Sequence, residues 1–427
     1  MGVNTIKLNW DDIMKKKYIL VVNLRRLTKE AYISLQAIKT QGFNILLIAK
    51  EMPSYCKDIV DNYVPVDTKN YDLTIATVKQ LSKEFVIAGV VAFTETAVEI
   101  CSYIANELNL PGNPVEAVKY SRNKLAMRQQ LLKADIEQIP HLHIKDIKQL
   151  KDGIVNIGFP VIVKPINSSG STGIFHLTCN EDVKVVIDNL KNINNPSYDP
   201  ISRTNTIEFI IEKYIEGPEV SVEGLVFNSE VSICGITDKL TTMDYKIEYQ
   251  HIFPSAFSEH QKEIIQLEVK KIIACLGFDN CSFHLEGKLY NDKFYLIEVA
   301  TRPAGGYIAS HLIPNATNQN YYEDLVKIAV GIRPTTQYTA KSYSGIRFII
   351  AQNEGVFSSI NNWSDLTQHP LVNSLFVETE IGSQIRLPPK DYRSLRLFAY
   401  IVNGASYIEV SDTLSTLANL AQPTVQE

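Results

Sequence analysis

Alternating apolar and polar runs at the start of the chain predict a β-α-β unit. YILVV (18–22) is a short apolar run that predicts a buried strand. Residues 28–41 carry apolar side chains at helical spacing, with Thr28 as the expected N-cap. Gly42 ends this helix, and FNILLIA (43–49) predicts a second strand. Two strands joined through a helix predict a parallel sheet.

The same alternation continues more weakly to about residue 114 and then breaks. VIAGVVAF (86–93) predicts a further buried strand, and helical spacing follows from Thr96 to about Leu108. LPGNP (110–114) combines two prolines with a glycine, which ends the regular structure sharply. This part of the chain lacks a Gly-x-Gly-x-x-Gly fingerprint, so we do not expect it to bind a dinucleotide.

The rest of the chain shows a mixed pattern that predicts both helices and strands. Helices are expected at 115–135, at 259–276, at 321–330 and near 411–421. Strands are expected around a Gly/Ser-rich loop within 159–175, as a pair at 206–213 and 219–227, and as short runs through 341–427. Residues 191–205 are polar and turn-rich, which predicts a surface loop. The chain is therefore expected to combine α/β and α+β parts.

Composition places the chain among packed globular proteins of more than one domain. It is long at 427 residues, and its 45% hydrophobic and 21% charged content is that of a folded protein. The net charge of -5 is spread along the chain and predicts no nucleic-acid partner. The six cysteines have neither Cys-x-x-Cys nor zinc spacing, which predicts free thiols. Because no apolar run has the length of a membrane span and the N-terminus lacks an apolar signal core, we expect a cytoplasmic protein with no membrane partner.

The segment FHLEGKLYNDKFYLIEVATRPAGG (283–306) predicts a hairpin that carries two carboxylates. Side chains on a strand alternate between its two faces. A two-residue turn at Asn291–Asp292 would place Glu286 opposite Ile297. Glu298 would then lie on the other face. A three-residue turn or a β-bulge would instead set Glu286 directly opposite Glu298.

A divalent cation would account for two carboxylates in that register, because like charges directly opposite each other repel. Mg²⁺ in nucleotide enzymes is usually bound by one or two carboxylates, and substrate phosphates complete its shell. Arg302 follows four residues after Glu298, and its planar guanidinium suits a phosphate or a carboxylate. The alternative for this segment alone is a solvated hairpin with scattered charges.

Two further segments predict contacts to a phosphorylated ligand. The loop SSGSTG (168–173) follows the strand that carries Lys164, and its glycines and serines would let backbone and hydroxyl groups approach a phosphate. It does not open a helix, so it is not a Walker-type loop. In EKYIEGPE (212–219) the extended backbone would contact an adenine edge, and Glu219 would accept hydrogen bonds from ribose hydroxyls. Taken alone, each segment is also compatible with an ordinary hairpin.

In their order along the chain, these motifs resemble the ATP-grasp superfamily of carboxylate–amine ligases. The resemblance covers about residues 18 to 330. It implies ATP and Mg²⁺ (or Mn²⁺) as cofactors, and an ATP-grasp fold with an N-terminal parallel α/β domain and a C-terminal β-rich domain. The implied parts are an N-terminal domain (1–114), a small subdomain with the phosphate loop (115–205), a large subdomain with the metal site (206–335) and the C-terminal domain (336–427).

The resemblance also implies a role for each motif residue. Contacts to ATP would come from Lys124, Lys164, Ser169, Gly170, Ser171, Gly173, Glu212, Lys213, Ile215 and Glu219. Glu286 and Glu298 would bind the metal, and Arg302 would face the transferred phosphate or the substrate carboxylate. Many members have Asn two residues after the second glutamate. This chain has Ala300 there, so water or phosphate would complete the shell of the metal.

Three segments, 93–113, 251–259 and 302–308, resemble the branch that includes bacterial L-amino-acid (dipeptide) ligases. Such enzymes activate the carboxylate of one amino acid as an acyl phosphate, which the amine of a second amino acid attacks. In that branch Glu95 would pair with a substrate ammonium, and His251 would help to deprotonate the attacking amine. The plain alternatives are an acid at a helix start and a packed histidine.

The expected function is therefore an ATP-dependent ligase that joins a small-molecule carboxylate to an amine, with ADP and phosphate as products. An ATP-grasp carboxylase or formyl-transfer enzyme acting on a small metabolite is the alternative, and a non-catalytic nucleotide-binding protein is a third hypothesis. We take a homodimer as the assembly to test, because homodimers are the commonest oligomers.

Overall fold

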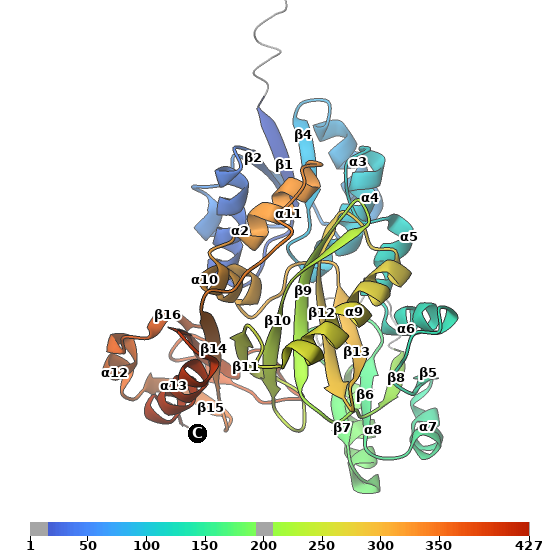
Figure 1. Cartoon of the computed structure of the whole chain (residues 1–427), viewed down its shortest axis with the longest axis vertical. Coiled ribbons are helices and arrows are strands. Elements are labelled where there is room, and N and C mark those ends of the chain that lie inside the picture. Colours follow the sequence, from blue (N-terminus) through green and yellow to red (C-terminus); the bar gives the residue numbers. More distant parts are fainter. Residues whose placement is uncertain (1–15, 194–207, 427) are drawn as a thin grey trace, which may run out of the picture. The chain divides into compact units, whose positions relative to one another are not determined.

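The structure is a computed structural model, and it describes residues 16–193 and 208–426 (Figure 1). As far as they are described, residues 1–115 and 322–334 form one compact unit, and residues 116–321 and 335–427 form another. The four-part division expected from the sequence stays a prediction. The structure assigns the short stretch 322–334 to the first unit, although it is far from the rest of that unit in the sequence.

The first unit is built on a parallel sheet, as its β-α-β pattern predicts. Within the described residues the strand order is β3-β2-β1-β4, and each pairing is parallel. Its strands are β1 (Lys17–Val22), β2 (Asn44–Ala49), β3 (Asn62–Pro65) and β4 (Val86–Val91). Its helices are α2 (Thr28–Thr40), η1 (Ser54–Cys56), α3 (Tyr71–Leu81), η2 (Glu95–Ala97), α4 (Val98–Glu107) and most of α11 (Tyr321–Ala329). Apolar strand residues such as Leu20 and Leu46 share one core with Ile100 of α4.

Two helix starts differ from the sequence predictions. Thr28 is the first residue of α2 and not its cap, since the N-cap is Leu27, whose side chain makes no capping bond. The helix predicted at 115–135 is divided into α5 (Val115–Val118), η3 (Lys119–Ser121) and α6 (Lys124–Lys133). The side chain of Asn123 accepts a hydrogen bond from the backbone N–H of Ala126 and so caps α6 after the interruption.

A small antiparallel sheet in the second unit carries the Gly/Ser-rich loop. Its strands, in the order β5-β8-β6-β7 among the residues described, are β5 (His141–Ile144), β8 (Phe209–Lys213), β6 (Val161–Pro165) and β7 (Phe175–Leu177). The helices of this region are η4 (Ile147–Gln149), α7 (Leu150–Ile157) and α8 (Asn180–Ile193). Ile154 of α7 and Val186 of α8 pack on the sheet. The surface loop predicted at 191–205 lies outside the described residues from residue 194 onward.

A large antiparallel sheet forms the centre of the second unit. In the part of the chain that the structure describes, its order is β13-β12-β9-β10-β11-β14-β18-β16. Its strands are β9 (Glu219–Phe227), β10 (Glu230–Thr241), β11 (Glu248–Phe253), β12 (Cys281–Tyr290), β13 (Lys293–Ala300), β14 (Tyr343–Ile350), β16 (Val372–Val377) and β18 (Arg396–Gly404). The strand pair predicted at 206–213 and 219–227 is not a pair, because β8 and β9 belong to different sheets.

The remaining elements belong mostly to the β-rich C-terminal part. They are η5 (Ile308–Leu312), α10 (Ile313–Thr317), β15 (Gly355–Ile360), α12 (Trp363–Gln368), β17 (Gln384–Ile385), α13 (Tyr407–Leu420) and β19 (Pro423–Gln426). Helix α13 corresponds to the helix predicted near 411–421, and its Leu414 packs in a core with Phe398 of β18. The C-terminal strands β14, β16 and β18 extend the large sheet.

The large sheet has one apolar face and one polar face around β9 and β12. Val222 and Leu285 lie in a core with α9 (Glu259–Leu276), which matches the predicted helix and packs on β10, β12 and β13 (Figure 1). Side chains alternate along a strand, so the intervening residues face the other side. Those residues are Glu219, Ser221, Glu223, His284, Glu286 and Lys288. The period-two patterns EVSVE and HLEGK thus place charged side chains on the face opposite the core.

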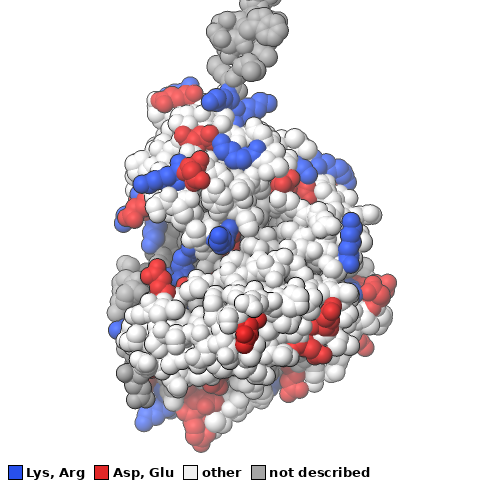
Figure 2. Space-filling model, turned by 90° about the vertical axis from the view of Figure 1, so that its left-hand side faces the viewer, with Lys and Arg blue, Asp and Glu red and all other residues white. Residues whose placement is uncertain are grey.

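Helices that are both long and apolar enough to cross a bilayer are absent from the described residues. On the face shown in Figure 2, basic and acidic side chains are interspersed over the upper part, and acidic side chains are the more frequent ones lower down. This pattern agrees with the modest net charge of -5.

Candidate functional site

The hairpin of β12 and β13 has the register that a shared cation requires. Its turn is the two-residue Asn291–Asp292, and both residues have positive φ angles, 51° and 54°. A β-bulge between Glu286 and Gly287 then shifts the pairing by one residue, so that Glu286 lies opposite Glu298. The sequence left a three-residue turn or a bulge as the two ways to reach this register, and the structure has the bulge.

A cavity of about 240 Å³ lies within the second unit and brings most of the motif residues together. The predicted residues that line it are Lys124, Lys164, Ser169, Gly170, Ser171, Glu212, Lys213, Ile215, Glu219, Glu286, Glu298 and Arg302. Gly173 and His251 are not among its lining residues. Glu95 begins η2 in the first unit, so its predicted contact with a substrate ammonium stays a prediction.

A cationic cluster is formed by Lys124 and Lys164, which line one side of the cavity, and by the buried Arg128, which is not among its lining residues. The buried carboxylate of Glu212 makes ion pairs with Lys164 at 2.7 Å and Arg128 at 2.8 Å. Burial alone would raise the pKa of Glu212, but these two cations hold it at about 2. Glu212 therefore anchors the two cations, and its predicted contact with adenine stays a prediction.

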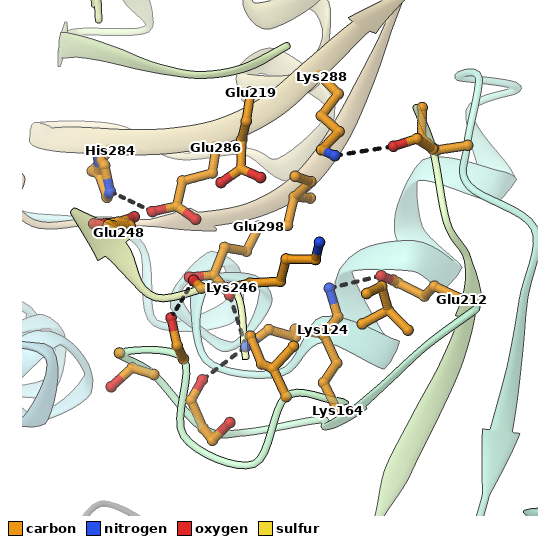
Figure 3. A pocket seen from close by; sticks show the side chains of 18 of the residues that line it. Lys124, Lys164, Glu212, Glu219, Lys246, Glu248, His284, Glu286, Lys288 and Glu298 are labelled. Carbon is orange, nitrogen blue, oxygen red and sulfur yellow. Dashed lines mark hydrogen bonds and ion pairs between the residues drawn. The ribbon is translucent and has the colours of Figure 1, made fainter. Parts of the chain in front are cut away.

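Lys124 connects this cluster to the hairpin and to the phosphate loop. Its ammonium lies 2.9 Å from Glu298 Oε2 and donates to the carbonyl oxygen of Ser168 at 2.7 Å (Figure 3). The loop itself has left-handed backbone at Gly170 and Ser171, with φ angles of 65° and 60°. Successive N–H groups in such a turn can form a concave anion site. The predicted contact of this loop with phosphate stays a prediction.

The segment after β8 is fixed by lysines that sequence reasoning overlooked. Lys288 donates to the carbonyl oxygen of Ile215 at 3.0 Å, and its ammonium lies 4.3 Å from the ring centre of Tyr214. Lys246 lies 4.8 Å from the same ring centre, and its carbonyl oxygen accepts a bond from Ser171. Lys288 had a detectable signal, because it shares a strand face with Glu286. Lys246 had none, because it lies in the connection between β10 and β11.

The opposite side of the cavity carries a carboxylate cluster, formed by Glu219, Glu248 and Glu286. One carboxylate oxygen from each lies within 4.8 Å of the others. Burial, together with Glu286 and Glu248, raises the pKa of Glu219 to about 7, although Lys239 and Lys288 oppose the shift. Figure 3 shows Glu219, Glu248 and Glu286 on one side of the cavity and Lys124 and Lys164 on the other, with Glu298 between them.

Two buried cations hold the carboxylate cluster. The ammonium of Lys239, whose side chain is fully buried, pairs with Glu248 and lies 2.7 Å from Glu286 Oε1. His284 contacts Glu223 at 2.8 Å through Nδ1 and Glu286 Oε1 at 2.9 Å through Nε2. Burial would lower the pKa of His284, but Glu223 and Glu286 raise it to about 9, so the charged ring donates to both carboxylates.

His251 lies behind this cluster and does not reach the cavity. Its ring is fully buried, and Nε2 is 3.5 Å from Glu248 Oε2. Burial lowers the pKa of His251 to about 3. A neutral imidazole with so low a pKa is a weak base, which argues against the predicted deprotonation of an amine. That role stays a prediction, and the geometry favours the alternative of a packed histidine.

The oxygen atoms around Glu286 fit a hard divalent cation such as Mg²⁺ or Mn²⁺. The bonds from Lys239 and His284 both end on Oε1 of Glu286, so a metal would be bound through Oε2. Ser221 and Thr237 are in register with Glu286, and their buried hydroxyls have no hydrogen-bond partner among the described residues. Glu248 adds a further carboxylate that sequence reasoning missed.

Comparison with known proteins identifies the class. Residues 157–311 match the ATP-grasp domain, and residues 35–112 match the ATP-grasp N-terminal domain. The chain is therefore an ATP-grasp protein, and the fold expected from the order of its motifs is confirmed.

Its relatives include several amino-acid ligases. The chain is 31% identical over 225 residues to an alanine–anticapsin ligase of Bacillus subtilis (strain 168), a match that covers 49% of this chain and 46% of that protein. It is 25% identical over 323 residues to an L-arginine-specific L-amino acid ligase of Bacillus subtilis, covering 73% and 75%. The crystal structure of an L-amino acid ligase from Bacillus licheniformis superposes with a TM-score of 0.85 at 19% identity, covering 97% and 100%. The chain spans about half the length of the alanine–anticapsin ligases that it matches.

Proposed function

We propose that the protein is an ATP-dependent carboxylate–amine ligase that joins an amino acid to another amino acid or a similar acceptor. The proposal rests on one observation: the cationic cluster and the carboxylate cluster lie on opposite sides of the same cavity. Phosphates would lie against the cations, and a divalent metal would lie against the carboxylates. The relatives named as alanine–anticapsin and L-amino acid ligases support an amino acid as the substrate class.

The proposed chemistry has two steps. A substrate carboxylate oxygen attacks the γ-phosphorus of ATP, the bond to the β-phosphate oxygen breaks, and an acyl phosphate and ADP form. The neutral amine of the acceptor then attacks the acyl carbon. Phosphate leaves, and the amine loses a proton as the amide forms. Both steps move negative charge between oxygens, so stabilising that charge is the main task of the protein.

Each group of residues around the cavity would stabilise a different part of this charge. Lys124 and Lys164 would neutralise phosphate oxygens, and the loop at 168–173 would bind them through backbone N–H groups. Glu286 and Glu298 would hold Mg²⁺ or Mn²⁺, which would supply further neutralisation when bound. Arg302 lines the cavity and donates to the carbonyl oxygen of Pro303 at 3.0 Å. Its guanidinium would bind the substrate carboxylate or the transferred phosphate.

A product screen tests the proposal directly. The full chain is incubated with ATP, Mg²⁺ and pairs of amino acids, and ADP release and product mass are measured. We expect ADP formation that depends on both amino acids and a product equal to their sum minus water. ADP formation that depends on bicarbonate or formate would support the carboxylase or formyl-transfer alternative. Absence of ADP formation with every candidate substrate would support the non-catalytic hypothesis.

A further inference from the structure

We propose that Lys239 is a positioning residue whose ammonium is the resident cation of the carboxylate cluster and fixes Glu286 for the metal that accompanies the nucleotide. The inference rests on the proposed function only in assigning a metal to Glu286. By donor geometry alone, the carboxylate cluster resembles a metal site, because its oxygens lie within 4.8 Å of one another. The structure places a lysine ammonium among these oxygens.

The position of Lys239 in the sheet explains how it reaches the cluster. In β10 it lies directly opposite Glu219 of β9 and His251 of β11. From there its ammonium contacts Oε1 of Glu248 and Oε1 of Glu286. Its side chain is fully buried. Burying an ammonium costs desolvation free energy unless carboxylates and hydrogen bonds compensate its charge. The two carboxylate contacts therefore allow Lys239 to stay charged in the interior.

The charges of the cluster require such a cation. Three carboxylates packed within hydrogen-bonding range of a common point would repel one another in a poorly solvated site. Lys239 removes part of that repulsion without any ligand. Its loss would leave the carboxylates uncompensated, and a divalent cation is the species best suited to take its place.

Lys239 also fixes the orientation of Glu286. The carboxylate is held from two sides, because Lys239 and His284 both donate to Oε1. Partners of this kind orient a metal ligand before the metal binds, and their loss typically weakens metal affinity 10–100-fold. The lysine thus acts through Glu286 and needs no contact with substrate.

The test counts Mn²⁺ ions bound to the full-length, nucleotide-free protein, using electron paramagnetic resonance of the free ion. For Lys239→Met we expect one additional Mn²⁺ per chain relative to the unmodified protein, and a melting temperature that rises with Mn²⁺ concentration. The matched control is Lys213→Met. Lys213 lines the same cavity, but its ammonium donates to the carbonyl oxygens of Gly158 and Phe159. An equal Mn²⁺ count in Lys239→Met and the unmodified protein would overturn the proposal.

A second pair of variants keeps the proposal testable if Lys239→Met does not fold. Glu248→Gln removes one carboxylate, and Lys239→Met/Glu248→Gln then removes the lysine from a less charged cluster. We expect the double variant to bind Mn²⁺ with ADP about tenfold more weakly than Glu248→Gln, because Glu286 loses one anchor. Equal affinities would overturn the positioning role. Neither readout needs turnover, so failure of the amino-acid screen would leave the result for Lys239 standing.

Discussion

The cationic cluster and the carboxylate cluster are both buried groups of ions, but their charges are unbalanced in opposite directions. Among the described residues, the three cations of the first cluster pair with the carboxylates of Glu212 and Glu298. In the second cluster, Glu248 and Glu286 pair with Lys239, Glu286 also contacts His284, and Glu219 adds a third carboxylate. One side therefore keeps an excess of positive charge, and the other an excess of negative charge.

Under the proposed function, this difference shows how a site for a metal–nucleotide complex would be built before the ligand binds. A buried ion pair seldom stabilises a fold more than apolar packing would, so clusters of this size need another reason. Complementarity to phosphates on one side and to a cation on the other supplies that reason. The two clusters should then respond differently to substitution, since Glu212 completes a closed network and Glu286 belongs to an open one.

The largest effect is expected on stability, from Glu212→Gln. The change leaves the buried cations Arg128 and Lys164 without their shared carboxylate. Loss of one partner from a buried ion cluster typically costs about 3–5 kcal/mol, so the free energy of unfolding in urea should fall by that amount. The control is Glu137→Gln, whose pair with Lys293 is exposed and worth about 1 kcal/mol at most. Equal losses for the two variants would contradict the closed network.

Glu286→Gln should act on the reaction more than on the fold. The amide keeps the shape of the side chain but weakens metal binding at the open cluster. We expect ADP formation to fall on the order of 10³-fold, about 4 kcal/mol of transition-state stabilisation, with a melting temperature near that of the unmodified protein. The measurement is ADP release at saturating ATP and Mg²⁺. If Glu286→Gln released ADP at a rate within tenfold of that of the unmodified protein, Glu286 would not be a ligand of the metal.

Acid should weaken the closed network through Glu212. Its pKa is about 2 in the folded protein against an ordinary value of 4.5. A group with a lowered folded pKa stabilises the fold above its unfolded value, and that contribution is lost as the pH falls through the folded value. We expect a loss of about 3 kcal/mol between pH 5 and pH 2 from this residue. Urea unfolding across that range should show a smaller loss for Glu212→Gln, and parallel curves would refute the assignment.

The sequence predicts local features of the site well. The two glutamates of the hairpin, the lysine before the loop and the loop itself lie within short motifs, so spacing alone suggests their chemistry. The bulge at Glu286 is visible only indirectly, because a two-residue turn at Asn291–Asp292 conflicts with a shared cation. The correct register followed from a chemical requirement and not from turn preference.

The sequence analysis singled out Glu219 and Glu286, but it could not predict that Glu248 and Lys239 join them, because the order of the strands in the sheet brings these residues together. Lys239 of β10 and Glu248 of β11 lie in no motif, and they meet Glu286 of β12 because the strand order is β12-β9-β10-β11. The segment after β8 shows the same limit. Its sequence suggested a hairpin turn. In the structure, Gly217 packs against β12 so closely that a Cβ at this position would lie 2.4 Å from the carbonyl oxygen of Leu289. Pairings between distant strands decide both features.

The smallest effect is expected from Lys288, which contacts the segment after β8. Lys288→Met removes one hydrogen bond to the carbonyl oxygen of Ile215 and a cation above the ring of Tyr214. One such bond is worth about 1 kcal/mol, so the KM for ATP should rise about fivefold while kcat stays nearly constant. Because Lys288 also opposes the raised pKa of Glu219, a fall in kcat with unchanged KM would place it with the carboxylate cluster. The split between KM and kcat thus decides to which side of the cavity this lysine belongs.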